Sequence, residues 1–351
     1  MNRIRALVVD DSAYNRQTIK SMLEKDLEIE VVGVASDGVD AIGKTLRLEP
    51  DIITLDFEMP EMDGFSFLRW LMHERPTPVI MVSSYSNKNM AIKALECGAV
   101  DFISKPTRRA SKELKNIERD LLAKVRAALN TNMEMVARNI QYLSDEVPVS
   151  QTARHISQYD IVAIGSSTGG PAALQIILTQ LPSDLPAGIV ISQHMPKGFT
   201  APLAKRLDSI CRISVAEASD GDIVSKGKAL ICPGGFHMEF KRNGDSVKVM
   251  LHQSTDKDKY TPSVDRMMSS ASKCYRERTF GVILTGMGND GASGMSEIKA
   301  AGGYNIAESE QSAIVYGMPQ EAVKAGAVDK VFPVDIIASD IRGVLMGERR
   351  R

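Results

Sequence analysis

Short apolar runs alternate with helical segments along most of the chain, and this alternation limits the possible folds more than any other feature. In the N-terminal part, the apolar runs are IRALVVD (4–10), EVVGVAS (30–36), DIITLD (51–56), TPVIMVSS (77–84) and AVDFISK (99–105). Strands joined by helices form a parallel sheet that is covered on both faces. The pattern therefore predicts an α/β domain built on a five-stranded parallel sheet.

A second α/β domain is expected from Tyr159 onward. Its buried strands are predicted at DIVAIG (160–165), AGIVISQ (187–193), KALICPG (228–234), FGVILTG (280–286) and YNIAES (304–309). The run 238–251 alternates around Asn243–Gly244, which predicts a β-hairpin at one edge of a doubly wound sheet. A chain of 351 residues is long enough for two cores. We predict domains at 1–125 and 159–351, with a polar linker at 126–158.

The composition is that of a globular protein, with 43% hydrophobic and 25% charged residues and a net charge of −1. This charge gives no basic field for nucleic acid or an anionic membrane, so we expect neither nucleic-acid binding nor membrane insertion. The four cysteines, Cys97, Cys211, Cys232 and Cys274, lack metal-ligand spacing and indicate reduced thiols. The N-terminus lacks a signal-peptide pattern. These features predict a cytoplasmic location.

Acidic residues follow two of the N-terminal strands. Asp10 and Asp11 end the first strand and Asp56 ends the third, while Ser83 and Lys105 end the fourth and fifth. Ligands of open parallel sheets bind outside the carboxyl ends of the strands, so these groups are expected to meet in one crevice. Carboxylate oxygens suit Mg²⁺, and a carboxylate beside the metal can attack a phosphoryl group. Lys105 and the Ser83 hydroxyl then pair with the phosphoryl oxygens.

LVVDDSAYNR, DFEMPEMDG, MVSS and DFISKP together resemble the receiver domain of two-component response regulators, over about residues 1–108. The resemblance implies a flavodoxin-like fold and phosphorylation of Asp56 by a histidine kinase. It also implies Mg²⁺ bound by Asp10, Asp11 and Asp56, and switch positions at Ser83 and Phe102.

The run IVAIGSSTG (161–169) places Ser167 in a G-x-S-x-G frame, where a strand turns into a helix. Such a turn exposes a serine as a nucleophile, but glycine-rich turns also bind phosphates. A serine nucleophile needs a base. His194 follows a predicted strand directly, whereas His237 and His252 are weaker candidates. The convergence at one sheet edge favours His194 and an acyl-transfer reaction.

The third member of a triad is a carboxylate that orients the imidazole. Asp290 lies in the glycine-rich loop GMGNDGASG after the strand 280–286, although it could instead cap the next helix. Asp265 fits a capping role better. The backbone amides of Thr168 and Met287 are the candidate oxyanion donors. The order Ser, His, Asp differs from that of α/β-hydrolases, so membership of that fold is not implied.

GSSTGG, ISQHMPKGFT, PSVDRMM and VILTGMGNDGASGM resemble the catalytic domain of chemotaxis protein-glutamate methylesterases, over about residues 159–345. The family pattern places the nucleophile directly before T-G-G, which selects Ser167 over Ser166. The resemblance implies demethylation of glutamate methyl esters, and deamidation of glutamines, on methyl-accepting chemoreceptors. No cofactor is expected for the esterase reaction.

A receiver joined to a hydrolase suggests that the unphosphorylated receiver covers the triad and that phospho-Asp56 weakens this contact. Two other hypotheses stay open. The enzyme could act on a different ester or amide, or the second domain could only bind a partner. A DNA-binding output is disfavoured because the C-terminal half shows βα alternation and no basic recognition helix.

Overall fold

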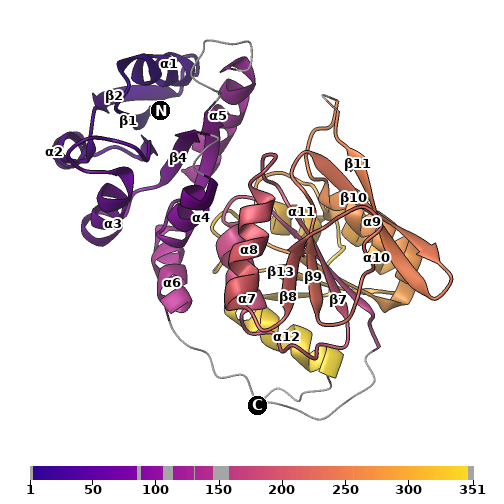
Figure 1. The fold of residues 1–351 in the computed structure, drawn as a ribbon. Helices are drawn as coiled ribbons and strands as arrows, with labels where there is room; N and C mark the ends of the chain where they lie inside the picture. The colour runs from indigo at the N-terminus through magenta and orange to yellow at the C-terminus, as the bar shows by residue number, and fades with distance from the viewer. Residues whose placement is uncertain are drawn as a thin grey trace. The chain divides into compact units, whose positions relative to one another are not determined.

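The computed structural model describes residues 3–84, 88–105, 114–129, 131–144, 158–255 and 257–346, and the chain divides into two compact units at residues 141/142 (Figure 1). Each unit is an α/β structure and is described by itself below. Among the described helices, none has the length and hydropathy that crossing a bilayer requires.

The N-terminal unit contains the predicted parallel sheet of five strands, in the order β2-β1-β3-β4-β5. The strands are β1 (Ile4–Val9), β2 (Ile29–Ala35), β3 (Ile52–Leu55), β4 (Val79–Ser84) and β5 (Asp101–Lys105). The helices are α1 (Ala13–Leu23), α2 (Gly38–Leu48), α3 (Gly64–Glu74), α4 (Lys88–Glu96) and α5 (Leu114–Ala128). Helix α1 packs against α5, and α2 packs against α3. All residues of β3 are buried, as expected for a strand covered on both faces.

A helix lies within the stretch that the sequence assigned to a linker. Helix α6 (Met133–Ser144) buries Met135 and Val136, and the Ile140 side chain lies against Gly98, where a Cβ atom would be 2.9 Å from Ile140 Cδ1. Positions 135, 136 and 140 share one face of a helix. Although the segment is polar overall, part of it therefore forms an amphipathic helix whose apolar face packs within the N-terminal unit.

The C-terminal unit is built on a seven-stranded parallel sheet in the order β14-β13-β12-β6-β7-β9-β8. Its strands are β6 (Ile161–Ser166), β7 (Gly188–Gln193), β8 (Ser214–Glu217), β9 (Lys228–Ile231), β12 (Thr279–Ile283), β13 (Tyr304–Glu308) and β14 (Lys330–Phe332). The chain adds strands on one side of β6 and later, from β12, on the other side. This reversal makes the carboxyl ends of β6 and β12 a topological switch point, where open sheets bind ligands.

Helices cover both faces of this sheet, as a doubly wound fold requires. Helix α7 (Gly170–Leu178) packs against α8 (Thr200–Ile210) and α12 (Val334–Met346). Helix α10 (Ala292–Ala300) packs against α9 (Val264–Tyr275) and α11 (Met318–Lys324).

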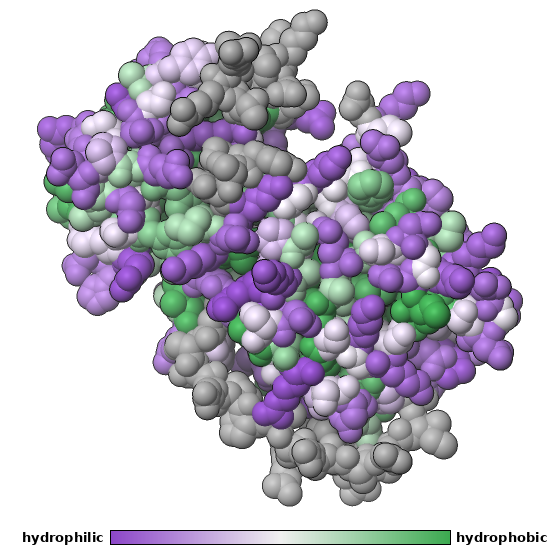
Figure 2. All heavy atoms as spheres, viewed as in Figure 1, coloured by the Kyte–Doolittle hydropathy of each residue, from purple (hydrophilic) through white to green (hydrophobic). Residues whose placement is uncertain are grey.

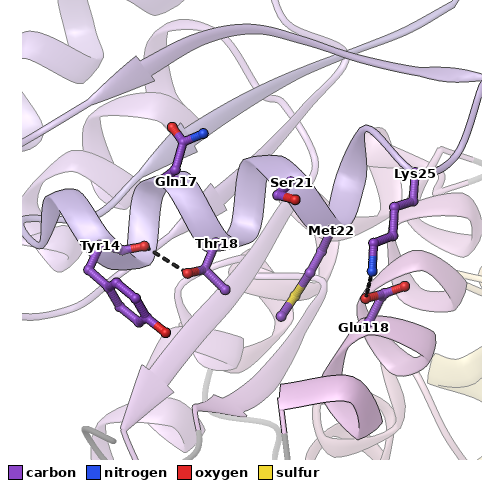
Figure 3. Close-up of a pocket in the computed structure, with 7 residues that line it drawn as sticks. All are labelled: Tyr14, Gln17, Thr18, Ser21, Met22, Lys25 and Glu118. Carbon is purple, nitrogen blue, oxygen red and sulfur yellow. Dashed lines mark hydrogen bonds and ion pairs between the residues drawn. The ribbon is translucent and has the colours of Figure 1, made fainter. Parts of the chain in front are cut away.

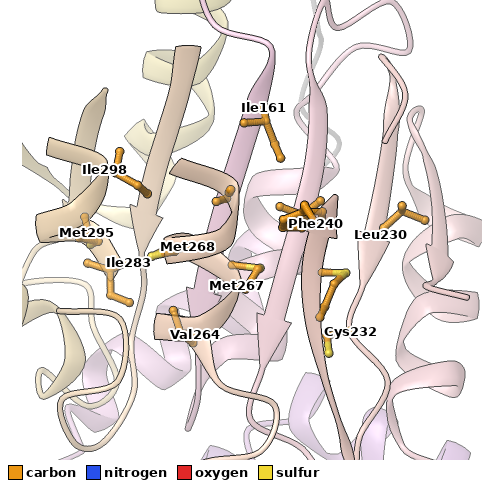
Figure 4. Close-up of a cluster of buried hydrophobic side chains, with 14 of the residues drawn as sticks. Ile161, Leu230, Cys232, Phe240, Val264, Met267, Met268, Ile283, Met295 and Ile298 are labelled. Carbon is orange, nitrogen blue, oxygen red and sulfur yellow. The ribbon is translucent and has the colours of Figure 1, made fainter. Parts of the chain in front are cut away.

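The predicted hairpin is present as β10 (Phe236–Asn243) and β11 (Ser246–Gln253), but it forms a separate two-stranded sheet instead of extending an edge of the large one. Its apolar face packs on α9, and the Phe240 N–H donates to Ser270 Oγ at 2.6 Å. Figure 4 shows this core, in which Phe240, Met267 and Met268 lie beside side chains from the strands. The hairpin therefore belongs to the layer that covers the sheet.

On the face drawn in Figure 2, hydrophobic residues are scattered among hydrophilic ones. Exposed large hydrophobic side chains in the described part of the chain include Tyr14, Leu27, Val39 and Ile223. The architecture thus directs attention to the strand ends.

Candidate active site

The two neighbouring serines at the end of β6 have different environments. Ser166 is fully buried, and its Oγ donates to Gln193 Oε1 at 2.6 Å. Ser167 is partly exposed, in the turn that leads into α7. A nucleophile must reach substrate, so this difference supports Ser167 over Ser166.

The turn that carries Ser167 depends on glycine at two positions. Gly169 has φ +78°, a left-handed conformation that glycine adopts readily. A Cβ atom at Gly170 would lie 2.1 Å from Gln193 Oε1, so no larger residue fits there without displacement. The turn can therefore pass close to the end of β7.

Gln193, the last residue of β7, ties the strand ends together, and the sequence analysis did not single it out. Its Nε2 donates to the Ser167 carbonyl at 2.9 Å and to the His194 carbonyl at 3.0 Å. The His194 N–H donates to the Ser166 carbonyl at 3.0 Å. An amide side chain at the carboxyl end of a predicted buried strand was the signal that could have identified it.

His194 and Asp290, which are 96 positions apart in the sequence, form a hydrogen bond of 2.7 Å between Nε2 and Oδ2. Only 13% of the His194 side chain and 2% of the Asp290 side chain are exposed. Because Nε2 is hydrogen-bonded to Asp290, Nδ1 is the ring nitrogen of His194 that is left for a further partner. No hydrogen bond joins Ser167 Oγ to His194 among the described residues; such bonds are often longer in the absence of substrate.

Asp290 does not cap the helix that follows it, as the alternative from the sequence had it, but the start of α9. Its carboxylate accepts hydrogen bonds from the N–H groups of Val264 (2.7 Å) and Asp265 (2.9 Å) in the first turn of α9. Asp265 in turn accepts from the N–H groups of Gly291 (2.9 Å) and Gly294 (2.7 Å), at the start of α10. The two carboxylates therefore cap each other's helices.

The hydrogen bonds of Asp290 decide its protonation. Burial by itself raises the pKa of this carboxyl group, but the hydrogen bond and charge of His194, together with the amides of Asp265 and Val264, lower the pKa below its ordinary value. Asp290 is consequently ionised at neutral pH, as a residue that stabilises an imidazolium must be.

The two candidate oxyanion donors lie on the segments next to Ser167. Thr168 is buried and its carbonyl accepts from Thr285 Oγ1 at 2.9 Å. Met287 is partly exposed, in the loop after β12. Its neighbour Gly286 approaches so closely that a Cβ atom there would be 2.6 Å from Ser167 Cβ. Both candidates therefore lie on segments that border Ser167, and their role as oxyanion donors stays a prediction.

The two competing histidines have local partners. His237 is fully buried and its Nδ1 accepts from the Ser263 N–H at 3.1 Å. His252 is 47% exposed and its Nε2 lies 3.7 Å from Glu239. These local contacts explain the positions of His237 and His252 without a place in the triad.

The acidic cluster of the N-terminal unit is also formed as expected. Ligand oxygens of Asp10, Asp11 and Asp56 lie within 4.8 Å of one another. Lys105 Nζ lies 2.6 Å from Asp10 Oδ2 and 2.5 Å from Asp56 Oδ2. Burial raises the pKa of Asp56; Lys105 opposes this effect and the charge of Asp10 adds to it. Three close carboxylates, one of them exposed, match the oxygen ligands that Mg²⁺ prefers, so the residues fit that ion.

Of the two predicted switch residues, Phe102 and Ser83, the structure describes the side chain of Phe102 only. Phe102 is buried, and Lys124 Nζ lies 5.5 Å from the centre of its ring. Ser83 is paired with Ser104 at the end of β4, but its side chain lies outside the described residues.

One pocket of the N-terminal unit shares no residue with the acidic cluster. It has a volume of about 390 Å³ and lies between α1 and α5, where Lys25 and Glu118 form an ion pair of 2.7 Å (Figure 3). Tyr14 and Met22 also line it. The acidic cluster therefore lies at the strand ends and outside this pocket.

The structure thus defines a two-part protein: a receiver-type α/β domain, and a doubly wound domain with Ser167 and a hydrogen-bonded His–Asp pair at its strand ends. A family model described as CheB methylesterase matches residues 162–341, and one described as response regulator receiver domain matches residues 6–117. The chain belongs to the CheB methylesterase family.

Full-length relatives support this assignment. The chain is 44% identical over 360 residues to "Protein-glutamate methylesterase/protein-glutamine glutaminase 3" of Geobacter sulfurreducens, with 97% of each chain covered. A relative from Halalkalibacterium halodurans is 45% identical, with 97% of this chain and 98% of that one covered. The crystal structure of the Thermotoga maritima CheB methylesterase catalytic domain is 42% identical and has a TM-score of 0.52, covering 53% of this chain and 99% of that one.

Proposed function

We propose that the protein hydrolyses glutamate methyl esters on methyl-accepting chemoreceptors, with Ser167, His194 and Asp290 as a catalytic triad. The observation that carries this proposal is the His194–Asp290 hydrogen bond, at the same sheet edge as the partly exposed serine of the β6–α7 turn. The names of the full-length relatives supply the substrate. The residues alone specify acyl transfer and leave the ester unidentified.

The reaction proceeds by covalent catalysis. Ser167 Oγ attacks the ester carbonyl carbon while His194 Nδ1 takes the hydroxyl proton, and backbone N–H groups near Thr168 and Met287 stabilise the oxyanion. The tetrahedral intermediate collapses, the C–O bond to methoxide breaks, and His194 donates its proton so that methanol leaves. Water then attacks the acyl-enzyme with His194 again as base, which releases Ser167 and the glutamate carboxyl group.

The same steps apply to a glutamine side chain, with ammonia as the leaving group. His194 must protonate this leaving group, because an amide anion is a much poorer leaving group than methoxide. The proposal therefore includes receptor deamidation, in agreement with the second part of the relatives' names.

The receiver is proposed to control this reaction. A histidine kinase of the chemotaxis system supplies the phosphoryl group, which Asp56 accepts as an acyl phosphate. Asp10, Asp11 and Asp56 would hold Mg²⁺, which neutralises charge during the transfer. Lys105, already within hydrogen-bonding distance of Asp56, pairs with the added negative charge. Phosphorylation then weakens a covering contact between the receiver and the catalytic site.

The direct test incubates methylated chemoreceptor membranes with the protein, with and without Mg²⁺ and a small phosphodonor, and measures methanol. Ser167→Ala is expected to abolish methanol release. Ser166→Ala is the matched control, because it removes the neighbouring hydroxyl, which is buried and cannot reach substrate. The proposal is wrong if the parent chain releases no methanol under either condition. If activity survives in Ser167→Ala and disappears in a folded Ser166→Ala protein, the nucleophile is Ser166 and not Ser167.

A further inference from the structure

Tyr260, which the triad chemistry above does not use, lies flat against the ring of His194. The two ring centroids are 5.1 Å apart and the ring planes differ by only 4°. Tyr260 is partly exposed and belongs to the segment between β11 and α9. The catalytic histidine is therefore contacted on its ring face by one element and on its Nε2 edge by another.

The same tyrosine contacts the loop that carries Asp290. Its hydroxyl donates to Asn289 Oδ1 at 3.1 Å, one residue before the aspartate. A Cβ atom at Gly288, which has φ +91°, would lie 2.4 Å from Tyr260 Oη. Tyr260 thus fits between His194 and the backbone that positions the partner of His194.

The geometry shows what the stacking adds. A single hydrogen bond from Nε2 to Asp290 is a weak constraint on the imidazole, because the ring can still turn about its Cβ–Cγ bond, which carries Nε2 away from Asp290 and changes the direction of Nδ1. A parallel aromatic ring removes this freedom, because tilting the imidazole would break the contact between the two faces. Nδ1 must point at Ser167 for proton transfer, so the plane of the ring matters as much as its position.

The segment that carries Tyr260 has anchors of its own. Asp258 accepts from the Thr255 N–H at 2.7 Å and from Thr255 Oγ1 at 2.9 Å, and the Ser263 N–H donates to His237 Nδ1 at 3.1 Å. These bonds lie on both sides of Tyr260 and use none of its atoms. Replacing the tyrosine side chain therefore leaves the path of the segment supported.

We propose that Tyr260 is a positioning residue that fixes the plane of the His194 ring, so that Nε2 stays on Asp290 while Nδ1 faces Ser167. The catalytic consequence rests on the proposed function, whereas the ring geometry does not. Charged groups beside this stack, among the described residues, include Asp290 on Nε2 and Lys259, whose Nζ lies 4.7 Å from the Tyr260 centroid. The position of the ring, rather than its charge, is the property that the tyrosine controls.

Three variants of the full chain separate the ring from its hydroxyl. Tyr260→Phe keeps the stacking ring and loses the bond to Asn289, whereas Tyr260→Leu loses the ring. Tyr260→Met is a second flexible replacement in case the leucine protein does not fold. Tyr275→Leu is the control, because Tyr275 ends α9 at the opposite end from Val264.

Two measurements are made on each folded variant. Imidazole ¹⁵N shifts of His194, recorded without substrate, report which ring nitrogen carries the proton. Methanol release from methylated receptor membranes gives kcat and KM. For the leucine or methionine protein we expect a mixture of the two neutral tautomers and a kcat lower by ~10–100-fold, with little change in KM. The phenylalanine protein should keep the parent tautomer and lose no more than about threefold in kcat.

Other results would overturn the proposal. An unchanged His194 tautomer and unchanged kcat in the leucine protein mean that the ring does not position the histidine. A phenylalanine protein as impaired as the leucine protein would assign the role to the hydroxyl instead. If the parent chain releases no methanol, the proposed function fails, while the ¹⁵N shifts still decide whether Tyr260 holds the His194 ring.

Discussion

The carboxylates of Asp290 and Asp265 lie at the amino ends of two helices, and each accepts hydrogen bonds from the other's helix. Their pKa values nevertheless move in opposite directions. Burial raises the pKa of Asp265, its bonds to Gly294 and Gly291 oppose this effect, and the charge of Asp290 adds to it. Asp290 has His194 as a partner, which lowers its pKa despite burial. A neighbouring imidazole therefore distinguishes Asp290, the proposed member of the triad, from Asp265.

This difference predicts unequal effects of removing each charge. Asp290→Asn keeps an oxygen for the α9 amides but no longer stabilises the imidazolium, so kcat should fall by about 10³–10⁴-fold. Asp265→Asn is the matched control, and it should lower thermal stability with a much smaller loss of kcat. Initial rates of methanol release and melting temperatures check both. An Asp290→Asn protein with more than a tenth of the parent kcat would contradict the assigned role.

Glu308 gives a second prediction at this scale. It is fully buried at the end of β13, where it accepts from the Thr285 N–H (2.8 Å) and from Ser312 Oγ (2.9 Å). Burial raises its pKa to about 7, against the effect of these two bonds. The folded protein thus holds a proton that the unfolded chain releases above its ordinary pKa of 4.5. Stability should therefore fall as pH rises from about 4.5 to about 7.

Glu308→Gln should remove this dependence, because the amide does not ionise; its oxygen can accept from the Thr285 N–H while its NH2 group donates to Ser312 Oγ. The unfolding free energy of the parent relative to the variant should decrease by roughly 3 kcal/mol between pH 4.5 and pH 8, as a shift of this size implies. Denaturant unfolding of the C-terminal unit at several pH values measures it. The same difference at both ends of this range would show that Glu308 does not titrate there.

At the scale of elements, the β6–α7 turn sets where the nucleophile lies. Gly170→Ala would place a methyl group 2.1 Å from Gln193 Oε1, the amide that holds the Ser167 and His194 carbonyls. We expect a lower melting temperature and a lower kcat. Gly43→Ala is the control, because nothing lies within 4 Å of that position in α2, and it should raise helix stability by about 0.5–1 kcal/mol. Equal effects of the two substitutions would contradict the close approach seen at Gly170.

The sequence predicted those elements whose residues are buried on both faces, because their apolar runs have no other explanation. It missed β8 and β14, which lie at the two edges of the large sheet and carry exposed residues, and it did not recognise α6 in a polar segment. The hairpin was expected, but its packing on α9 depends on tertiary contacts that a local pattern does not contain.

In the candidate site too, residues next to buried strands were predicted, and residues that depend on tertiary contacts were not. Ser167, His194 and Asp290 each follow a buried strand, so the sheet topology places them at one edge. Gln193 and Tyr260 were not predicted, because they contact Ser167 and His194 from other segments of the chain. The spacing of residues in the sequence does not reveal such tertiary contacts. Lys105 lies within ion-pair distance of Asp10 and Asp56, although the three residues come from three different strand ends.

At the scale of the whole molecule, two sites on separate sheets are proposed to act in sequence. Asp56→Asn should abolish the stimulation of methanol release by a phosphodonor with Mg²⁺, because the amide cannot form an acyl phosphate. Asp63→Asn is the control; Asp63 caps α3 through the Ser66 N–H, and its variant should still be stimulated. Equal stimulation of the Asp56→Asn protein and the parent would contradict control through Asp56.

The central claim is that Ser167 forms a covalent bond with the receptor glutamate. It is tested most directly by mixing the phosphodonor-activated protein with methylated receptor membranes, quenching with acid at short times and mapping the adduct by peptide mass spectrometry. We predict an ester between Ser167 Oγ and a receptor glutamate that forms as methanol appears and is absent from Ser167→Ala. Methanol release with no adduct on Ser167, or an adduct on another residue, would contradict it.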